Sequence, residues 1–459
     1  MSTHDILILG GGVAGMAAAV AAIGRGLRPL LLESSRQLGG RARSFYAPAL
    51  GEEVDNGPHL LVGACHHTLD LLTTIGSRHL VKSANRVQYT FWNSSLGWHQ
   101  LSCPDWPAPW HVLAGLWQFP GLNWQDRLVA LRIGGDCLLL PASLAQQSVT
   151  QWLFSRGQTQ ALFQRFWSPL CLAILNEPPG SANARLFARV LADAFFKDRG
   201  GAIPLTITCP LSDLFARPCE NYILAHGGEI QYGRRVTDLT GDDSQLLTIG
   251  TNQGSIHQPP PTLCALPMTT VGRLLPAWRE EEGWDVLNHA PIVSVHLHYE
   301  QPTSLPAPLV GVPEMVSQWL LQRPSRQPGT ALSAVLSGAY REVHWSEEKL
   351  VTTVHQDVGK ILPQLANTPP RGHLVIKEHR ATLAAWPGVD DHRPQATTRW
   401  KNFALAGDWS RTGLPATLEG AVQSGRSGIS ELVKESGVSS PYLRRGRRTA
   451  PNNWPWPFR

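Results

Sequence analysis

Charged residues are scarce in this chain: Asp, Glu, Lys and Arg make up only 16% of its 459 residues, whereas 42% are hydrophobic. A chain of this length and composition has ample apolar material for two domains with cores of their own. The net charge of +5 is modest, and a dense basic cluster occurs once, at residues 444–448. Because no basic patch recurs elsewhere, the pattern does not favour nucleic-acid binding.

Cysteines are few and scattered. There are seven, an odd number, and no two of them form a C-x-x-C pair. This spacing argues against a zinc site or a disulfide framework and favours a reducing compartment. The first strand begins at about Asp5, which leaves no room for a signal peptide. We therefore expect a cytoplasmic protein without a bound metal.

No stretch is long and apolar enough for a transmembrane helix: the most apolar one, 128–144, is too short and contains Arg132 and Asp136. Tryptophans recur around a short apolar helix just before it, at Trp106, Trp110, Trp117 and Trp124. They suit either an interfacial segment that dips into lipid or the lining of a core or channel. The basic, aromatic tail at 438–459 is expected to be disordered. It either contacts anionic headgroups at the inner face of the cytoplasmic membrane or only solubilises the chain.

The N-terminus holds a strand followed by a glycine-rich turn. Residues 5–9 lead into Gly10-Gly11-Gly12-Val13-Ala14-Gly15, then into a helix expected over 16–26 and an apolar run, 27–32, that ends on Glu33 and Ser34. This is the dinucleotide-binding pattern in its full context of strand, turn, helix, strand and acid. Gly10 permits the tight turn, Gly12 lets the backbone approach a pyrophosphate, and Gly15 lets helix and strand pack closely. Glu33 is placed to accept hydrogen bonds from ribose hydroxyls.

A second glycine block, Gly39-Gly40-Arg41, begins six residues after Glu33. Its two glycines let the chain pass close to the diphosphate, and Arg41 can offer a fork of donors to phosphate oxygens. NAD dehydrogenases have no need of this element. Here the chain resembles the flavin amine oxidase and phytoene desaturase superfamily, and the resemblance implies FAD as the cofactor.

The C-terminal segment resembles the matching half of the same site. Residues 402–406 form a short apolar strand before Gly407-Asp408-Trp409 and a small-residue helix. The resemblance implies that Asp408 hydrogen-bonds the ribityl and diphosphate region. It further implies that the N–H groups of a helix beginning near Glu419 point at the pyrimidine edge of the flavin. The remaining residues implied to contact FAD are Val236, through its backbone at the adenine, and Leu418 and Ala421.

These segments predict an α/β fold in which a Rossmann-type FAD-binding domain is interleaved with an α+β substrate-binding domain. The first substrate segment is mostly helical in period, and the second contains an alternating strand at 292–299. A helix at 222–226 and strands at 235–239, 246–249, 255–257 and 263–266 mark a return to the FAD-binding domain. The predicted boundaries are 1–85, 215–275 and 398–437 for the FAD-binding domain and 86–214 and 276–397 for the substrate domain.

Four blocks narrow the resemblance to one family. They are Asp55-Asn56-Gly57-Pro58-His59, a W-x-P-L-x-x-A-x-L-N segment at 167–176, an apolar strand at 384–388 and T-G-L-P-A-T-L-E-G-A at 412–421. Up to about Gly437 the chain resembles the hydroxysqualene dehydroxylases, also called squalene-associated desaturases. Gly57, Pro58 and His59 are then expected beside the flavin. Pro58 stands where the family commonly has Gln, and it removes an N–H at that face.

The resemblance implies reductive removal of the allylic hydroxyl of hydroxysqualene, which gives squalene for hopanoid synthesis. The synthases that make this long isoprenoid precursor are candidate partners. The reaction needs an apolar channel, an acid near the flavin and no bulk water. Aromatic residues over 91–124 and 163–196 can line the channel. His59 is the best candidate for the acid, although it can equally serve only to hydrogen-bond the flavin or backbone. Asp55 is better suited to anchoring its loop.

Other functions stay open. A phytoene-like desaturase would use the same fold with hydride flowing the other way, and a flavin-bound carrier would hand isoprenoid between synthases without turnover. Amine oxidases often use a flavin-facing Lys, and none of the seven lysines here has a recognisable context. Because no second G-x-G-x-x-G is present for NAD(P)H, the external reductant either binds without that motif or is another protein.

Overall fold

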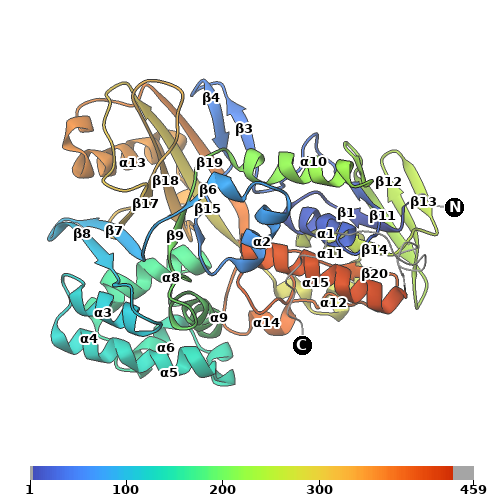
Figure 1. Cartoon of the computed structure of the whole chain (residues 1–459), viewed down its shortest axis with the longest axis horizontal. Helices are drawn as coiled ribbons and strands as arrows, with labels where there is room; N and C mark the ends of the chain where they lie inside the picture. Colours follow the sequence, from blue (N-terminus) through green and yellow to red (C-terminus); the bar gives the residue numbers. More distant parts are fainter. Residues whose placement is uncertain (1–3, 438–459) are drawn as a thin grey trace.

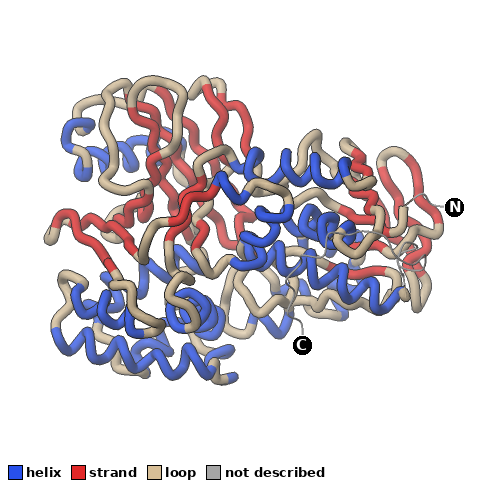
Figure 2. Tube along the Cα trace, in the orientation of Figure 1, coloured by secondary structure: helices blue, strands red, loops and turns tan. Residues whose placement is uncertain are grey.

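Three lobes make up the part of the chain, residues 4–437, that this computed structural model describes (Figure 1). The lobe at the right of the figure contains the N-terminal strand and, beside it, the last helix. A lobe rich in strands lies at the upper left, and a lobe of short helices lies at the lower left. Figure 2 shows the same division, with strands concentrated above and helices below.

A parallel five-stranded sheet forms the centre of the N-terminal lobe, in the order β10-β2-β1-β14-β20. Its strands come from three distant parts of the sequence, so the sheet is complete only when both ends of the chain have met. They are β1 (Ile6–Leu9), β2 (Pro29–Leu32), β10 (Glu229–Gln231), β14 (Thr262–Cys264) and β20 (Phe403–Leu405).

The two faces of this sheet are covered by different layers. Ile6 and Ile8 pack in the core formed with α1 (Val13–Ile23), α10 (Arg217–Ala225) and α15 (Leu418–Ser436). Leu7 and Leu9 belong to the core on the other side, which includes a hairpin sheet of β11 (Val236–Gly241), β12 (Leu246–Thr251) and β13 (Gly254–His257). Burial on both faces explains why β1 is apolar throughout.

Helices α1 and α15 touch at backbone distance. A Cβ built on Gly425 would lie 2.1 Å from the carbonyl oxygen of Ala14. The small residues of both helices are therefore required for their packing. Further elements of this region are α2 (His66–Thr74), α11 (Met268–Leu274), α12 (Pro276–Glu281), β3 (Ser44–Ala47), β4 (Glu52–Asp55), β5 (Leu61–Val62), β6 (Val81–Ser83) and β9 (Pro204–Ile207).

The upper lobe is a seven-stranded mixed sheet in the order β19-β15-β18-β17-β16-β7-β8. On β15, Val293, Val295 and Leu297 face the core beneath helix α13 (Glu347–Ile361). Ser294 and the histidines alternate with them and so occupy the opposite face. The strands are β7 (Gln88–Asn93), β8 (Gly97–Ser102), β15 (His289–Tyr299), β16 (Leu309–Val312), β17 (Gln318–Gln322), β18 (Thr330–Ser337) and β19 (Gly372–Leu383).

The lower lobe consists of short helices interrupted by π-helical turns. The helices are α3 (Trp110–Gln118), α4 (Trp124–Ala130), α5 (Gly134–Leu139), α6 (Val149–Ser155), α7 (Gln160–Leu162), α8 (Ser168–Leu175) and α9 (Ala184–Leu191). A 3₁₀ turn, η2 (Leu131–Ile133), joins α4 to α5 without a break. The π turns η4 (Phe163–Trp167) and η5 (Ala192–Phe196) adjoin α8 and α9. A short helix, α14 (Val389–His392), precedes β20.

The sequence-based fold class is confirmed, with differences at element ends. The predicted bounds of the first helix, 16–26, are wrong at both ends. The helix begins at Val13, because Gly12 is extended and caps it, and it ends at Ile23. The helix expected at 222–226 begins at Arg217. The domain boundaries stay a prediction, and the tail at 438–459 lies outside the described residues. Within residues 4–437, no helix combines the length and the apolarity that crossing a bilayer requires.

Candidate functional site

The turn after β1 leaves a space above Gly12. Gly10 has a φ of +99°, a conformation that favours glycine, and a Cβ on Gly15 would lie 1.9 Å from the carbonyl oxygen of Gly10. A Cβ on Gly12 would meet no heavy atom within 4 Å. Val13 and Ala14 begin the helix here, so their N–H groups lack partners within the helix. This open end of α1 fits a pyrophosphate.

Glu33 is held beside the same turn. Its Oε2 accepts a hydrogen bond from the Gly11 N–H at 2.7 Å, and its Oε1 accepts one from the Ser35 N–H at 2.7 Å. Ser34 is exposed, with its Oγ 3.2 Å from Glu33 Oε1. The carboxylate is thus fixed at the end of β2, where its remaining lone pairs can accept from ribose hydroxyls. Val236, assigned to the adenine, is buried at the start of β11.

The second glycine block lies directly against the first. The Gly39 N–H donates to the carbonyl of Gly11 at 2.8 Å. Gly39 and Gly40 both have positive φ, +113° and +59°. A Cβ on Gly40 would lie 3.2 Å from the Cα of Gly12. The chain therefore passes close over the turn, and its approach to a diphosphate stays a prediction.

Arg41 and Asp408 meet although they are far apart in the sequence. Arg41 Nη2 lies 2.6 Å from Asp408 Oδ1, and Nη1 donates to the Ala381 carbonyl at 2.6 Å. The carboxylate of Asp408 raises the pKa of Arg41. The two side chains that the sequence assigns to the diphosphate and the ribityl chain are therefore brought together. This ion pair connects the N-terminal glycine block to the C-terminal Gly407-Asp408 turn.

Arg393 was missed by the sequence analysis. Its guanidinium is buried and donates to the carbonyls of Asp408 at 2.9 Å and Leu414 at 2.7 Å. It also forms an ion pair with Asp390 at 2.9 Å. Arg393 thereby fixes the loop that carries Asp408. No motif marks this residue, because its role is visible only when the folded loop encloses it.

Helix α15 begins at Leu418, next to Glu419, where the sequence predicts its start. Thr417 caps the helix by accepting from the Gly420 N–H at 3.2 Å. The side chain of Glu419, however, caps α2: it accepts from the N–H groups of His67 and Thr68 at 2.8 and 2.9 Å. Only the backbone of Glu419 is therefore left for a flavin. Leu418 is half-buried and Ala421 is buried.

Asp55 anchors its loop. Its Oδ1 accepts from Ser44 Oγ at 2.6 Å and from the Leu211 N–H at 2.9 Å. Burial raises the pKa of this carboxyl group. Gly57, two residues on, faces β15: a Cβ there would lie 3.7 Å from Ser294 Oγ. The loop therefore lies between the N-terminal lobe and the polar face of the upper sheet.

His59 has one ring nitrogen already engaged. Its Nδ1 lies 2.7 Å from the Gly57 carbonyl, which can only accept, so Nδ1 carries the hydrogen. Burial lowers the pKa of His59, and the nearby Arg41 also lowers it. At neutral pH the favoured ring is then neutral and offers a lone pair at Nε2. Pro58 beside it is half-buried.

A buried polar cluster lies next to this loop. Glu52 and Arg323 form an ion pair at 2.5 Å with side chains only 9% and 10% exposed. His296 is fully buried, with Nδ1 2.7 Å from Ser333 Oγ. Burial, reinforced by the charge of Arg323, lowers the pKa of His296 to about 3. The alternation in β15 was readable from the sequence, but the partners of its polar face were not.

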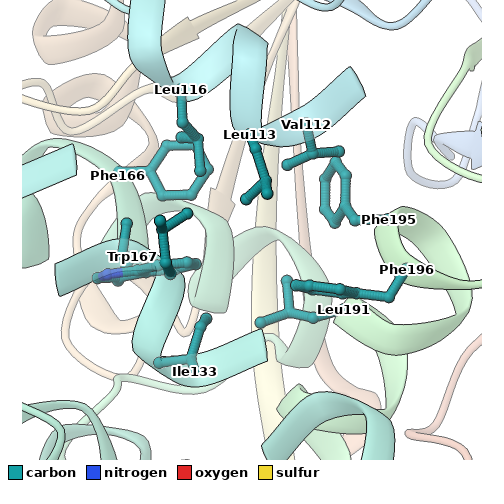
Figure 3. A pocket seen from close by; sticks show the side chains of 11 residues that line it. Val112, Leu113, Leu116, Ile133, Phe166, Trp167, Leu191, Phe195 and Phe196 are labelled. Atoms are coloured by element: carbon teal, nitrogen blue, oxygen red, sulfur yellow. The ribbon is translucent and has the colours of Figure 1, made fainter. Parts of the chain in front are cut away.

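An apolar cleft lies within the lower lobe (Figure 3). Its free interior measures about 30 Å³, and the cleft is partly open to solvent. Both π turns contribute aromatic rings to it, and such turns are frequent at functional sites. The lining residues are all apolar: Val112, Leu113, Leu116, Ala130, Leu131, Ile133, Phe166, Trp167, Leu191, Phe195 and Phe196.

Comparison with known proteins identifies the family. The flavin containing amine oxidoreductases match this chain over residues 13–428. A hydroxysqualene dehydroxylase from Rhodopseudomonas palustris is 30% identical over 95% of this chain and 99% of its own length. The chain belongs to the hydroxysqualene dehydroxylase family of flavin-containing amine oxidoreductases. The zeta-carotene desaturase of Solanum lycopersicum is 25% identical to this chain. The match covers 92% of this chain but only 79% of the length of the desaturase.

A solved structure agrees on the fold alone. Cyclohexylamine oxidase from Brevibacterium oxydans IH-35A has a TM-score of 0.70 and 15% identity, covering 95% of this chain and all of its own. Family membership makes this protein an FAD-dependent oxidoreductase. Its residues fit that cofactor, since the open space over Gly12 and the adjoining glycine block provide the cradle that a diphosphate needs.

Proposed function

We propose that this enzyme reductively removes the allylic hydroxyl of hydroxysqualene to give squalene. The observation that carries the proposal is the likeness to a hydroxysqualene dehydroxylase over nearly the whole of both chains. The likeness to a carotene desaturase is weaker and leaves about a fifth of that protein unmatched. The sequence blocks around His59 and at 412–421 favour the same choice.

The apolar cleft supports a hydrocarbon substrate through the chemistry of its walls, and its free interior of about 30 Å³ must widen to admit a long isoprenoid. Its walls contain no charged residue, so moving a hydrocarbon chain into it from another apolar environment costs little free energy. Aromatic rings continue from it toward the upper sheet. The distances between neighbouring ring centroids are 6.1 Å for Phe166 and Phe119, 5.9 Å for Phe119 and Phe91, and 6.0 Å for Phe91 and Trp319. This row of rings leads from the cleft to β17.

The reaction breaks one C–O bond and forms one C–H bond. FAD, when bound and reduced, would supply the hydride for the new C–H bond, and the hydroxyl would leave as water after taking up a proton. The chain's own part is to exclude bulk water, because an allylic cation would otherwise be captured. Aromatic faces along the cleft stabilise such a positive charge.

We assign the proton donor to His59. Since Nδ1 is committed to the Gly57 carbonyl, the proton must leave from Nε2. Burial lowers the pKa of this ring, so its protonated fraction is small at neutral pH and grows as the pH falls. Asp55 is the weaker candidate because its Oδ1 already accepts two hydrogen bonds.

An anaerobic single-turnover experiment tests the proposal. Enzyme reduced in advance is mixed with hydroxysqualene, flavin reoxidation is followed by absorbance, and squalene is measured by mass spectrometry. We expect one squalene per flavin reoxidised. If oxidised enzyme instead becomes reduced by a carotene precursor while hydroxysqualene is left unchanged, the protein is a desaturase. If neither substrate turns over in flavin-loaded enzyme, the carrier function replaces the proposal.

A further inference from the structure

Large apolar side chains are exposed on helices α3 to α5 of the lower lobe and on the loop before them. The continuous rod α4–η2–α5 presents Trp124 (62% exposed), Leu128 and Leu139 (81% exposed) to solvent. Helix α3 adds Trp110, 61% exposed. Together with the other exposed members, they form what we call the α3–α5 face: Trp106, Trp110, Trp117, Trp124, Leu128, Leu131, Leu138 and Leu139.

The helical spacing of these residues places them on a single stripe. Trp124, Leu128, Leu131 and Leu138 recur at intervals of four, three and seven, which is one side of an α-helix. Asp126, Ile133 and Cys137 lie on the other side of the same rod and are buried. The rod therefore has a complete inner face, and the outer stripe is additional to what its packing needs. Exposed apolar patches of this kind mark interaction surfaces.

Exposed charge around this face is of one sign. Between Trp106 and Asn176 the sequence has only two carboxylates, Asp126 and Asp136, and both are buried. Its four cations are Arg127, Arg132, Arg156 and Arg165, of which the last three are exposed.

Nearby acids do not reverse this sign. Asp105, which precedes the face, forms an ion pair with Arg199 at 2.7 Å. Asp198 is exposed, and its neighbour Lys197 is paired with Asp193 at 2.5 Å, so Asp198 is one negative charge against Arg132 and Arg165. The α3–α5 face thus combines exposed tryptophan and leucine with two exposed arginines, Arg132 and Arg165, whereas Arg156 is paired with Asp136 at 2.6 Å.

We propose that the α3–α5 face seats the enzyme on the surface of an anionic lipid bilayer. Tryptophan rings favour the headgroup level, leucines enter the acyl boundary, and arginines attract anionic headgroups. A protein partner would more often meet such rings with a mixed-charge rim, whereas the excess of positive charge here matches a lipid surface.

The face adjoins the apolar cleft. Leu131 lines the cleft and is 43% exposed, so it belongs to both. Helix α3 likewise has Trp110 outside and Val112 in the cleft wall. A hydrocarbon dissolved in the bilayer could pass into the cleft at this point without crossing water. This delivery step rests on the proposed function, but the docking itself does not.

Vesicle sedimentation of the full chain tests docking without any need for turnover. Vesicles of phosphatidylcholine alone are compared with vesicles containing equal phosphatidylglycerol. The Trp110→Gln/Trp124→Gln/Leu139→Gln variant should bind at least tenfold more weakly, since three apolar groups no longer enter lipid. A matched control, Tyr46→Gln/Leu224→Gln, alters exposed apolar residues in other parts of the molecule and should bind like wild type.

A charge variant separates the second contribution. Arg132→Gln/Arg165→Gln should bind phosphatidylglycerol vesicles roughly 30-fold more weakly, from about 1 kcal/mol per arginine. Its control, Arg341→Gln/Arg371→Gln, removes two cations from the upper lobe and should bind normally.

Three outcomes would overturn docking through this face. The first is wild-type vesicle binding by the apolar variant. The second is binding that vanishes only when 438–459 are deleted. The third is an apolar variant that changes oligomeric state while its vesicle binding is unchanged, which would make the face a contact between two copies. Loss of turnover with normal vesicle binding would count against the proposed function alone.

Discussion

The N-terminal lobe and the helical lower lobe use apolar residues in opposite ways. Strand β1 is buried on both sides, and the site beside it is made from backbone, at Gly12 and Gly39. The lower lobe leaves tryptophans exposed on one side and encloses a cleft of side chains on the other. A backbone site requires glycines at fixed spacing, so a sequence pattern reveals it. A side-chain site depends on which faces meet, and its pattern is ambiguous.

The largest expected effect is the loss of FAD when a side chain is added to the backbone site at Gly12. Gly12→Val should fold yet retain no FAD, because a side chain would occupy the space that the structure leaves open for the pyrophosphate. Flavin absorbance per protein and circular dichroism measure the two properties separately. Gly15→Val is the companion variant: it should disrupt folding, since its Cβ would lie 1.9 Å from a carbonyl oxygen. Normal flavin content in folded Gly12→Val would refute the cradle.

The next effect concerns the loop between the lobes. His59→Ala should keep its flavin but lose roughly 10²-fold or more in the rate of dehydroxylation if His59 is the acid. In wild type, the rate should fall as the pH rises through a pKa below the ordinary histidine value, because burial lowers it. Single-turnover rates across pH provide the measurement. A wild-type rate in the variant, or a flat profile, would remove His59 from the mechanism.

A substitution at Arg393 tests whether a buried side-chain contact contributes to FAD binding as the glycine turn does. Arg393→Leu removes donors from the carbonyls of Asp408 and Leu414 inside a buried loop. Losing a hydrogen bond to a charged group costs about 1.5–3 kcal/mol, so FAD should bind at least tenfold more weakly. Flavin titration of the apoenzyme measures this. The control Arg411→Gln changes an exposed arginine of the same loop and should bind FAD normally.

The smallest expected effect is a change in the pH dependence of stability, caused by His296 in the upper sheet. His296 keeps a pKa of about 3 when folded, below its unfolded value, so folding favours the neutral ring. The stability it contributes is complete above the unfolded pKa and is lost as the pH falls toward 3. His296→Asn should therefore flatten the fall in unfolding free energy between pH 5.5 and 4 by up to about 1.4 kcal/mol per pH unit. Denaturant titrations at several pH values, with exposed His79→Asn as control, would reveal an unchanged slope if this is wrong.

Much of the cofactor half could be predicted from sequence because its determinants are local. The turn at Gly10–Gly15, the position of Glu33 beside it, the adjoining Gly39-Gly40-Arg41 block and the helix after Thr417 are local structures that the sequence predicts, while their contacts with FAD stay predictions. The pairing of Arg41 with Asp408 was not predictable, since it depends on two ends meeting.

The features that the sequence did not predict depend on contacts between segments that are distant in the chain. Glu419 was expected at the flavin, but its side chain caps α2, because that helix happens to begin beside it. For the tryptophans at 106–124, sequence left a lipid-facing segment and a core or channel lining equally open. The structure shows that these tryptophans are exposed, which excludes a core position for them, while lipid contact stays a proposal.

The most direct test of the account follows one hydrogen atom. Enzyme is reduced and equilibrated in deuterated water, so that the exchangeable hydrogen of its reduced flavin is deuterium, and is then mixed anaerobically with unlabelled hydroxysqualene. Reductive dehydroxylation predicts squalene that carries one deuterium, at the carbon that lost the hydroxyl. Unlabelled squalene, or no squalene from fully reduced enzyme, would contradict the account.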